Sequence, residues 1–242
     1  MAYKEGTRVG ISIREMSTIV QILILIDLIL SLLFVADYAI GRPFYKITDL
    51  LDLDSELSVA NWYSSVKYFI LFTLLAIISY YSYLKNKTSI SLFMLPLLFL
   101  LMSIDESAHI HEYIGWQLDA LLPEGSRENT IFSVTGIWMI AIGIPFILIF
   151  AWVAYSVKDF LKDSKFNFKL FIVGMVVLLT GAIGVEALSN FVEGGLLVMQ
   201  ITVEEGLEML GVTIMIWSAY GLAMENLAHL LNFGPESNLF KQ

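Results

Sequence analysis

Residues 17–41 read STIVQILILIDLILSLLFVADYAIG, and Asp27 and Asp37 are the only charged residues in this run. A helix that crosses the hydrocarbon core of a bilayer needs about 20 mostly apolar residues. Five further stretches of this kind follow, at residues 59–84, 88–114, 131–157, 167–193 and 203–231. Because the connections between them are short, we expect an all-α integral membrane bundle of six transmembrane helices, with residues 1–242 forming a single transmembrane domain.

The composition of the whole chain agrees with this expectation. Of its 242 residues, 57% are hydrophobic and 15% are charged, whereas about 25% of the residues of a soluble domain are charged. The chain has no cysteine, which excludes disulfides, thiolate metal sites and iron–sulfur clusters. A net charge of −9 makes nucleic acid a poor partner. Membrane lipid is the expected surrounding, and the oligomeric state is left open.

The positions of Lys and Arg predict the orientation. Ten of the fourteen basic residues lie in the N-terminal segment, in two connections around residues 85–87 and 158–169, and in the C-terminal tail. Since cytoplasmic loops carry the excess of basic residues, we expect both termini to be cytoplasmic in the cell membrane. The other four, Arg42, Lys46, Lys67 and Arg127, are assigned to the opposite side.

An acidic segment, residues 47–57 (ITDLLDLDSEL), follows the first span. Its leucines and Ile47 share one helical face and its acids share another, which predicts a short interfacial helix. Two roles are open for it. It can rest on the lipid headgroups, which is the interpretation we favour, or it can cap a site and attract cations.

Acidic residues converge on one depth of the membrane. Uncharged runs separate charged residues at the two boundaries: 17 residues between Lys87 and Asp105, 16 between Lys169 and Glu186, and 16 between Glu208 and Glu225. At 1.5 Å per residue each run spans about 24–26 Å. Three helices therefore bring acids to one layer near the outer boundary, and Asp37 is expected on the same side.

Helical spacing also gathers these side chains on common faces. On ideal helices the three groups are Asp105, Glu106, His109 and Glu112; Glu186, Asn190 and Glu193; and Glu204, Glu205 and Glu208. Alternatives remain for some members. Glu204 and Glu205 can simply meet a helix N-terminus, and Glu112 and Glu193 can be solvated beyond the span. Asp27, in mid-span, either bonds to a neighbour or has a functional role.

No Lys or Arg is expected in this layer, so the carboxyl groups need another source of compensation. Either some are protonated, or one or two divalent metal ions neutralise them. Glu106-x-x-His109 matches one of the two Glu-x-x-His elements of helical di-iron and di-manganese bundles, and Glu205-x-x-Glu208 stands where the second would be. Iron or manganese is therefore favoured, with zinc as an alternative.

Three segments, Asp105-Glu106 through His111-Glu112, Val185 to Leu188, and Glu204 to Gly211, resemble a pattern of uncharacterised bacterial polytopic membrane proteins: D-E-x-x-x-I-H-E, E-x-L and E-E-x-x-E-M-L-G. The resemblance covers the second half of the chain and implies no settled function. It implies His111 as the shared histidine, whereas helical geometry favours His109, and both stay open. The candidate metal ligands are Asp105, Glu106, His109, His111, Glu112, Glu186, Glu205 and Glu208. The secondary candidates are Asp27, Asp37, Asn190, Glu193 and Glu204.

Three functions are compatible with this cluster. The favoured one is a metal-dependent membrane enzyme, an oxidoreductase or a hydrolase, acting on a lipid-phase small molecule. The second is a cation or proton transporter or sensor, although we see no continuous polar path beyond Asp27. The third is a membrane scaffold whose acids hold a structural metal or form a protonated network.

Overall fold

The structure is a computed structural model that describes residues 13–85, 89–122, 127, 130–158 and 165–232. The described residues form helices and connections, with no strand among them. Six of their helical segments are long and apolar enough to cross a membrane: Thr18–Ala39, Val59–Leu84, Ile90–Ala108, Met139–Val157, Phe168–Phe191 and Gly195–Met224. The expected all-helical fold, with six helices long and apolar enough to cross a membrane, is thereby confirmed.

Two of the helices match the expected spans closely. Helix α1 covers Ile13–Ala39 and helix α3 covers Val59–Leu84. Ser58 begins α3 as its N-cap, since its side chain accepts a hydrogen bond from the backbone N–H of Asn61 at 3.1 Å. Between these helices the acidic segment is helical only as α2, Tyr45–Leu51. Residues 52–58, half of the expected interfacial helix, form a loop instead.

The other spans contain irregular backbone. The third expected span is divided into α4, Ile90–Ala108, and α5, Ile110–Asp119. In the fourth, a π-helical segment η2, Met139–Gly143, precedes α6, Ile144–Val157. Pro145 lies in the first turn of α6, where its missing N–H is tolerated. The fifth is formed by α7, Lys165–Leu179, a π-helical segment η4, Thr180–Val185, and a 3₁₀ segment η5, Glu186–Phe191.

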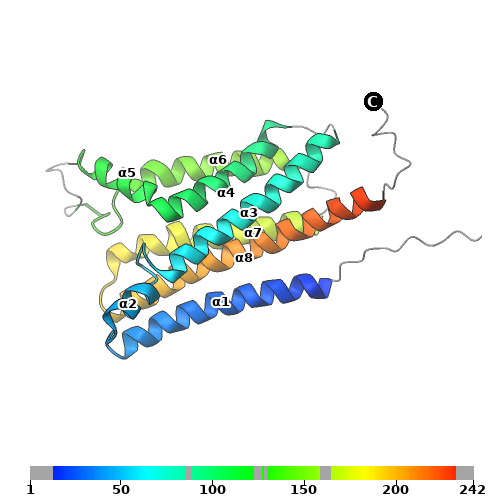
Figure 1. Cartoon of the computed structure of the whole chain (residues 1–242). Helices are drawn as coiled ribbons and strands as arrows, with labels where there is room; N and C mark the ends of the chain where they lie inside the picture. The colour runs from blue at the N-terminus through cyan, green and yellow to red at the C-terminus, as the bar shows by residue number, and fades with distance from the viewer. Residues whose placement is uncertain (1–12, 86–88, 123–126, 128–129, 159–164, 233–242) are drawn as a thin grey trace, which may run out of the picture.

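The last helix, α8, covers Gly195–Asn232 and is the centre of the bundle. It packs against α1, α3 and α7, and also against η4 and η5. Helix α4 packs on α3, and α6 packs on α4 on the far side of the bundle from α1 (Figure 1). The main apolar core joins α3, α4, α6, α7 and α8 around buried side chains such as Leu71, Phe99, Val153 and Met215.

Two glycines allow α7 and α8 to approach each other closely. A Cβ atom at Gly211 would lie 2.5 Å from the backbone nitrogen of Leu178, and one at Gly181 would lie 2.7 Å from the carbonyl oxygen of Glu204. Gly184 and Gly206, by contrast, have ordinary space around them. Gly174 makes a further close contact, since a Cβ atom there would lie 2.7 Å from the carbonyl oxygen of Gly211.

Replacing Gly211 by alanine should separate α7 from α8. The added methyl group would meet backbone atoms, which cannot rotate away, so we expect Gly211→Ala to destabilise the protein by about 1–3 kcal/mol, the usual cost of overpacking. Thermal unfolding in detergent measures the effect. Gly206→Ala on the same helix is the control, because its methyl would have 3.8 Å to Ser31 Oγ. Equal unfolding temperatures for the two variants would contradict the close contact.

Candidate functional site

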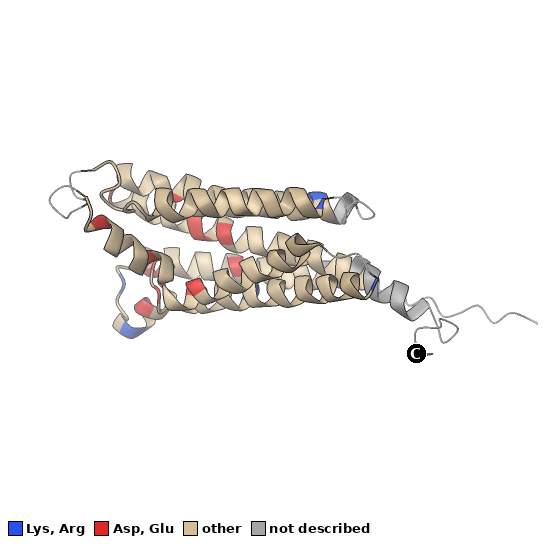
Figure 2. Ribbon diagram, turned by 90° about the horizontal axis from the view of Figure 1, so that it is seen from above, with Lys and Arg blue, Asp and Glu red and all other residues tan. Residues whose placement is uncertain are grey.

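A cavity of about 250 Å³ lies among the helices at the end of the bundle where α2 and α5 are found (Figure 1). Nine carboxylic acids and one histidine line it: Asp54, Glu56, Asp105, Glu106, His111, Glu112, Glu186, Glu204, Glu205 and Glu208. Figure 2 shows how strongly Asp and Glu gather in this half of the bundle. The acids come from the α2–α3 loop, α4, α5, η5 and α8, so segments distant in sequence build one site.

The break between α4 and α5 determines which histidine faces the cavity. His109 has φ 53° and ψ 38°, a left-handed conformation that ends α4, and histidine adopts this conformation more readily than most residues do. The expectation of a continuous helix over residues 88–114, with His109 on the face of Glu106 and Glu112, is therefore not what the structure has. After the break the chain turns, and His111 lines the cavity while His109 does not.

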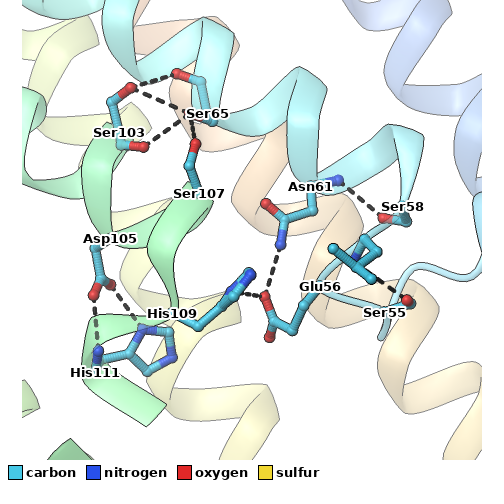
Figure 3. Close-up of polar contacts among 11 residues, drawn as sticks. Ser55, Glu56, Ser58, Asn61, Ser65, Ser103, Asp105, Ser107, His109 and His111 are labelled. Atoms are coloured by element: carbon cyan, nitrogen blue, oxygen red, sulfur yellow. Dashed lines mark hydrogen bonds and ion pairs between the residues drawn. The ribbon is translucent and has the colours of Figure 1, made fainter. Parts of the chain in front are cut away.

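Asp105 holds His111 in place. One carboxylate oxygen of Asp105 accepts a hydrogen bond from the backbone N–H of His111 at 2.8 Å, and the other lies 2.7 Å from its Nδ1 (Figure 3). The hydrogen bond to Asp105 and the charges of the nearby acids outweigh the effect of burial and raise the pKa of His111. The imidazole ring also lies 4.7 Å from the ring of Trp138. Nδ1 is thus occupied by Asp105, and Nε2 is the nitrogen available to a ligand.

The α2–α3 loop covers the cavity next to His109. The carboxyl group of Glu56 contacts Nδ1 of His109, and its Oε2 accepts a hydrogen bond from the side-chain amide of Asn61 at 2.8 Å (Figure 3). Burial, with a hydrogen bond to Glu112, raises the pKa of Glu56 from 4.5 to about 8. Asp54, from the same loop, also has a raised pKa through burial and the neighbouring acid Asp52. This loop therefore caps the cavity, the role that we did not favour from sequence.

The fifth span places only one of its three candidate polar residues in the cavity. Glu186 lines the cavity, whereas Asn190 accepts hydrogen bonds from the backbone N–H groups of Val134 and Thr135, at 3.0 and 3.2 Å. Glu193 is exposed and is not part of the lining. The expected common face required one uniform α-helix. The change from π to 3₁₀ helix at Glu186 alters the rotation per residue and separates the three side chains.

Helix α8 contributes three acids from a single face. Glu204, Glu205 and Glu208 all line the cavity. All three lie well inside α8, which begins at Gly195, so they are not end groups compensating the helix dipole. Glu204 is also hydrogen-bonded by the side chain of Gln200.

Lys67 lies within the membrane-spanning part of α3, where no basic residue was expected. Its Nζ is fully buried and lies 2.8 Å from Asp27 Oδ1, 2.8 Å from the carbonyl oxygen of Met209 and 3.4 Å from Thr213 Oγ1. Thr213 in turn donates a hydrogen bond to Asp27 Oδ2 at 2.8 Å. The placement of Lys67 on the outer side of the bundle, and the expectation that the acid layer has no basic residue near it, are therefore wrong. The positive charge of Lys67 interacts electrostatically with Glu106 and Glu205.

Two further secondary candidates, Asp27 and Asp37, make contacts that hold helices and turns together. Asp27 is the partner of Lys67. Asp37 accepts a hydrogen bond from Thr48 at 3.1 Å and lies 3.8 Å from Arg42, which also pairs with Asp52. These contacts stabilise the turn between α1 and α2. Asp37 is not one of the residues that line the cavity.

The donor set of the cavity is rich, but its side chains are not arranged around one point. Among the described residues, no group of three or more His, Asp or Glu side chains is close enough to hold a metal ion as placed. The predicted metal site is therefore not supported as an assembled coordination sphere. Seven of the eight predicted ligands line the cavity, namely Asp105, Glu106, His111, Glu112, Glu186, Glu205 and Glu208, and His109 does not.

Sequence reasoning missed Lys67 as a neighbour of the acids, and it gave the segment that holds Asp54 and Glu56 its capping role only as the less favoured alternative. A signal for Lys67 was present, since it is an ionisable residue inside an apolar span, and such a residue usually has a partner or a function. Asp27 was the partner to look for. For Asp54 and Glu56 the signal was the acidic segment itself, but the path of the loop that brings them over the cavity could not be read from the sequence.

The chain belongs to the family described as Domain of unknown function (DUF8692), which it matches over residues 22–224. All residues that line the cavity fall within this range. No curated protein and no solved structure matches the chain.

Removing only one partner of the Lys67–Asp27 pair should be strongly destabilising. Lys67→Met leaves a buried carboxylate with Thr213 as its remaining partner, and breaking a buried pair in this way costs about 3–5 kcal/mol. The double variant Lys67→Met/Asp27→Leu removes both charges and should regain much of the loss. Thermal unfolding of the three proteins in detergent tests this, and additive losses in the double variant would show that the two residues do not interact.

The stability of the protein should fall as the pH rises toward about 8. Because the pKa of Glu56 is about 8 when folded and 4.5 ordinarily, the folded protein keeps a proton that the unfolded chain has lost between these values. The contribution is complete below pH 4.5 and is lost as the pH approaches about 8.

Unfolding temperatures measured across this pH range should decline less steeply for Glu56→Gln than for the wild type. Glu193→Gln is the control, since Glu193 is exposed outside the cavity, and it should keep the wild-type slope. If Glu56→Gln has the wild-type slope as well, the proton is not held on Glu56.

Proposed function

We propose that the protein is a metal-dependent membrane enzyme that binds one or two divalent cations in the acid-lined cavity and acts on a substrate from the lipid phase. The observation that carries the proposal is the Asp105–His111 pair. A metal-bound histidine almost always donates its second ring N–H to a carboxylate or carbonyl, which fixes the ring and leaves the other nitrogen for the metal. Here Nδ1 of His111 lies 2.7 Å from Asp105, and the ring faces the cavity.

The acids that line the cavity together with His111 also support a metal site. Glu106, Glu186, Glu205 and Glu208 supply only carboxylate oxygens, and sets of carboxylates with few histidines suit iron or manganese in helical bundles. A bound cation would also compensate the charge of the nine acids, which Lys67 alone does not balance. The cation would supply Lewis acidity or redox chemistry. The protein would position it with these carboxylates and keep bulk water out with the α2–α3 loop.

The closed inner end of the cavity favours a binding or catalytic site over a conduit. Beyond the acids lie the Lys67–Asp27 network and then the packed apolar core that contains Leu71, Met215 and Ile216. From the Lys and Arg distribution we place the cavity on the extracytoplasmic side of the cell membrane, with cytoplasmic termini.

Metal analysis tests the proposal. Protein purified in detergent without chelators should contain about one to two iron or manganese ions per chain, and Glu106→Gln/Glu208→Gln should lose most of them. Glutamine keeps the shape of the side chain and removes like charges from a crowded site, so the double variant should fold. Glu193→Gln, outside the cavity, is the matched control and should retain the metal.

Two further results decide between interpretations. Stoichiometric zinc would make the enzyme a hydrolase rather than an oxidoreductase. If the wild type contains no metal, and if adding Mn²⁺ does not raise its unfolding temperature as a bound ligand should, metal binding is refuted.

A cation or proton transporter is the second candidate, and the buried Lys67–Asp27 pair favours it. Ion pairs inside membrane spans are costly and often mark ion pathways, and this pair lies next to the acids. Uptake of Mn²⁺ into vesicles that contain the wild type, abolished in Glu106→Gln/Glu208→Gln, would establish transport in place of catalysis.

A further inference from the structure

The wall of the cavity that faces the acids is apolar, and its residues come from other elements. Trp138, the N-cap of η2, lines the cavity together with Ile142 of η2 and Phe146 of α6. Leu178, Leu179, Ala182 and Ile183 form the adjoining part of the wall on α7 and η4. The acids, by contrast, come from the α2–α3 loop, α4, α5, η5 and α8. The acids and most of the apolar lining thus come from different elements, with Leu53 and Met102 as apolar residues on the elements that carry acids.

The two sides meet at His111. Its ring is held by Asp105 on the acidic side and lies 4.7 Å from the ring of Trp138, the first residue of the apolar wall. A molecule whose polar group reaches His111 and Glu106 would therefore have its next atoms beside Trp138 and Ile142.

Aromatic side chains close the inner end of the apolar part. Phe146 lines the cavity, and its ring lies 6.2 Å from that of Phe150. Phe150 is buried and packs edge-to-face on Phe99 at 5.7 Å and stacks near Phe171 at 6.5 Å. The cavity therefore ends in the bundle core. At about 250 Å³ it exceeds the engineered apolar cavity of about 150 Å³ that holds benzene, so a polar group and the first part of one chain fit, whereas two chains do not.

The location of this wall identifies the chemistry of its occupant. Ile142, Phe146 and Ile183 lie in segments that are able to cross a membrane, where hydrocarbon chains are the abundant apolar molecules. Helix α6 packs along α4 and η2 and does not pack closely along α8, and the cavity extends between the η2–α6 and α7–η4 segments.

We infer that the substrate is a single-chain amphiphile, whose head group reaches the carboxylates and whose first chain carbons lie between the η2–α6 and α7–η4 walls. This inference rests on the proposed function and adds the substrate class to it. The geometry assigns specificity for one chain to Ile142, Phe146 and Ile183, which define the width of the apolar part.

Photo-crosslinking tests the inference on the full-length protein. Two probes share one long alkyl chain with a diazirine close to the head group. One head group is an ammonium, which the acids attract directly, and the other is a carboxylate, which needs a bound cation. Peptide mapping should place the ammonium probe on residues 138–146 and 178–183. Ile183→Trp fills the apolar part and should lower this labelling by about tenfold.

A matched variant controls for the added tryptophan. Leu148→Trp lies on α6 at a side chain that is 64% exposed on the lipid-facing surface, and it should label like the wild type. Ile142→Phe is a smaller filling variant that keeps the test decisive if Ile183→Trp does not fold. Labelling confined to lipid-facing residues, or equal in wild type and both filling variants, would overturn the inference.

The second probe separates this inference from the metal proposal. The carboxylate probe should label the same residues only while the metal is bound, so EDTA should abolish its labelling and added Mn²⁺ should restore it. If the ammonium probe labels the wall and neither EDTA nor Mn²⁺ changes the labelling by the carboxylate probe, the single-chain site stands and the metal is refuted. If metal analysis is positive and neither probe labels the wall, the metal stands and the substrate class is wrong.

Discussion

Nine carboxyl groups share one cavity inside a bundle of helices long and apolar enough to cross a membrane, and compensating their mutual repulsion is the main constraint on this site. Two like charges about 4 Å apart repel each other by about 4 kcal/mol even at an effective dielectric constant near 20. The bundle offers one buried cation close by, Lys67, and much of its charge is matched by Asp27. The remaining negative charge must be compensated by protons, by a bound cation or by both. A cavity with this property is suited to binding positive charge.

The backbone irregularities lie around this cavity. The left-handed residue His109, the π-helical segments η2 and η4, and the 3₁₀ segment η5 all border it. At membrane depth, irregular backbone is tolerated where it is buried in protein or lines a cavity, and π-helical segments are frequent at functional sites. Elsewhere the helices are regular, and close contacts at Gly174, Gly181 and Gly211 press α7 against α8. The bundle thus combines rigid helix packing with a locally distorted site.

The two ends of the cavity have different surroundings. Its outer end is covered by the α2–α3 loop through Glu56, and its inner end meets the Lys67–Asp27 network and the aromatic side chains around Phe150. Its lining combines charged and apolar residues. A simple ion pathway would not need an apolar wall, whereas a site for the head and chain of an amphiphile needs both. The mixed lining is therefore the feature on which the proposed amphiphile site rests.

The amino-acid sequence by itself determined the class of the protein and the layer of the site. Long apolar runs must be helices in a membrane because backbone groups have no other partners there, and the spacing of Asp105, Glu186 and Glu208 from the opposite boundary placed these acids at one depth. The sequence did not determine how the backbone is rotated about each helix axis, and therefore which side chains point into the cavity. A single left-handed residue at His109, and the change of helix type at Glu186, turned His111 inward and took Asn190 and Glu193 away from the cavity.

Contacts between distant segments were likewise decided only by the tertiary structure. The pairing of Lys67 with Asp27, the cover formed by Glu56 and the apolar wall from Trp138 to Ile183 each join residues far apart in the chain. Helical periodicity relates residues within one helix, whereas the partners of a side chain in another helix depend on how the helices are packed. For this protein the sequence alone therefore specified the helices and the depth of their acids, and the packing of the helices decided which side chains share a cavity.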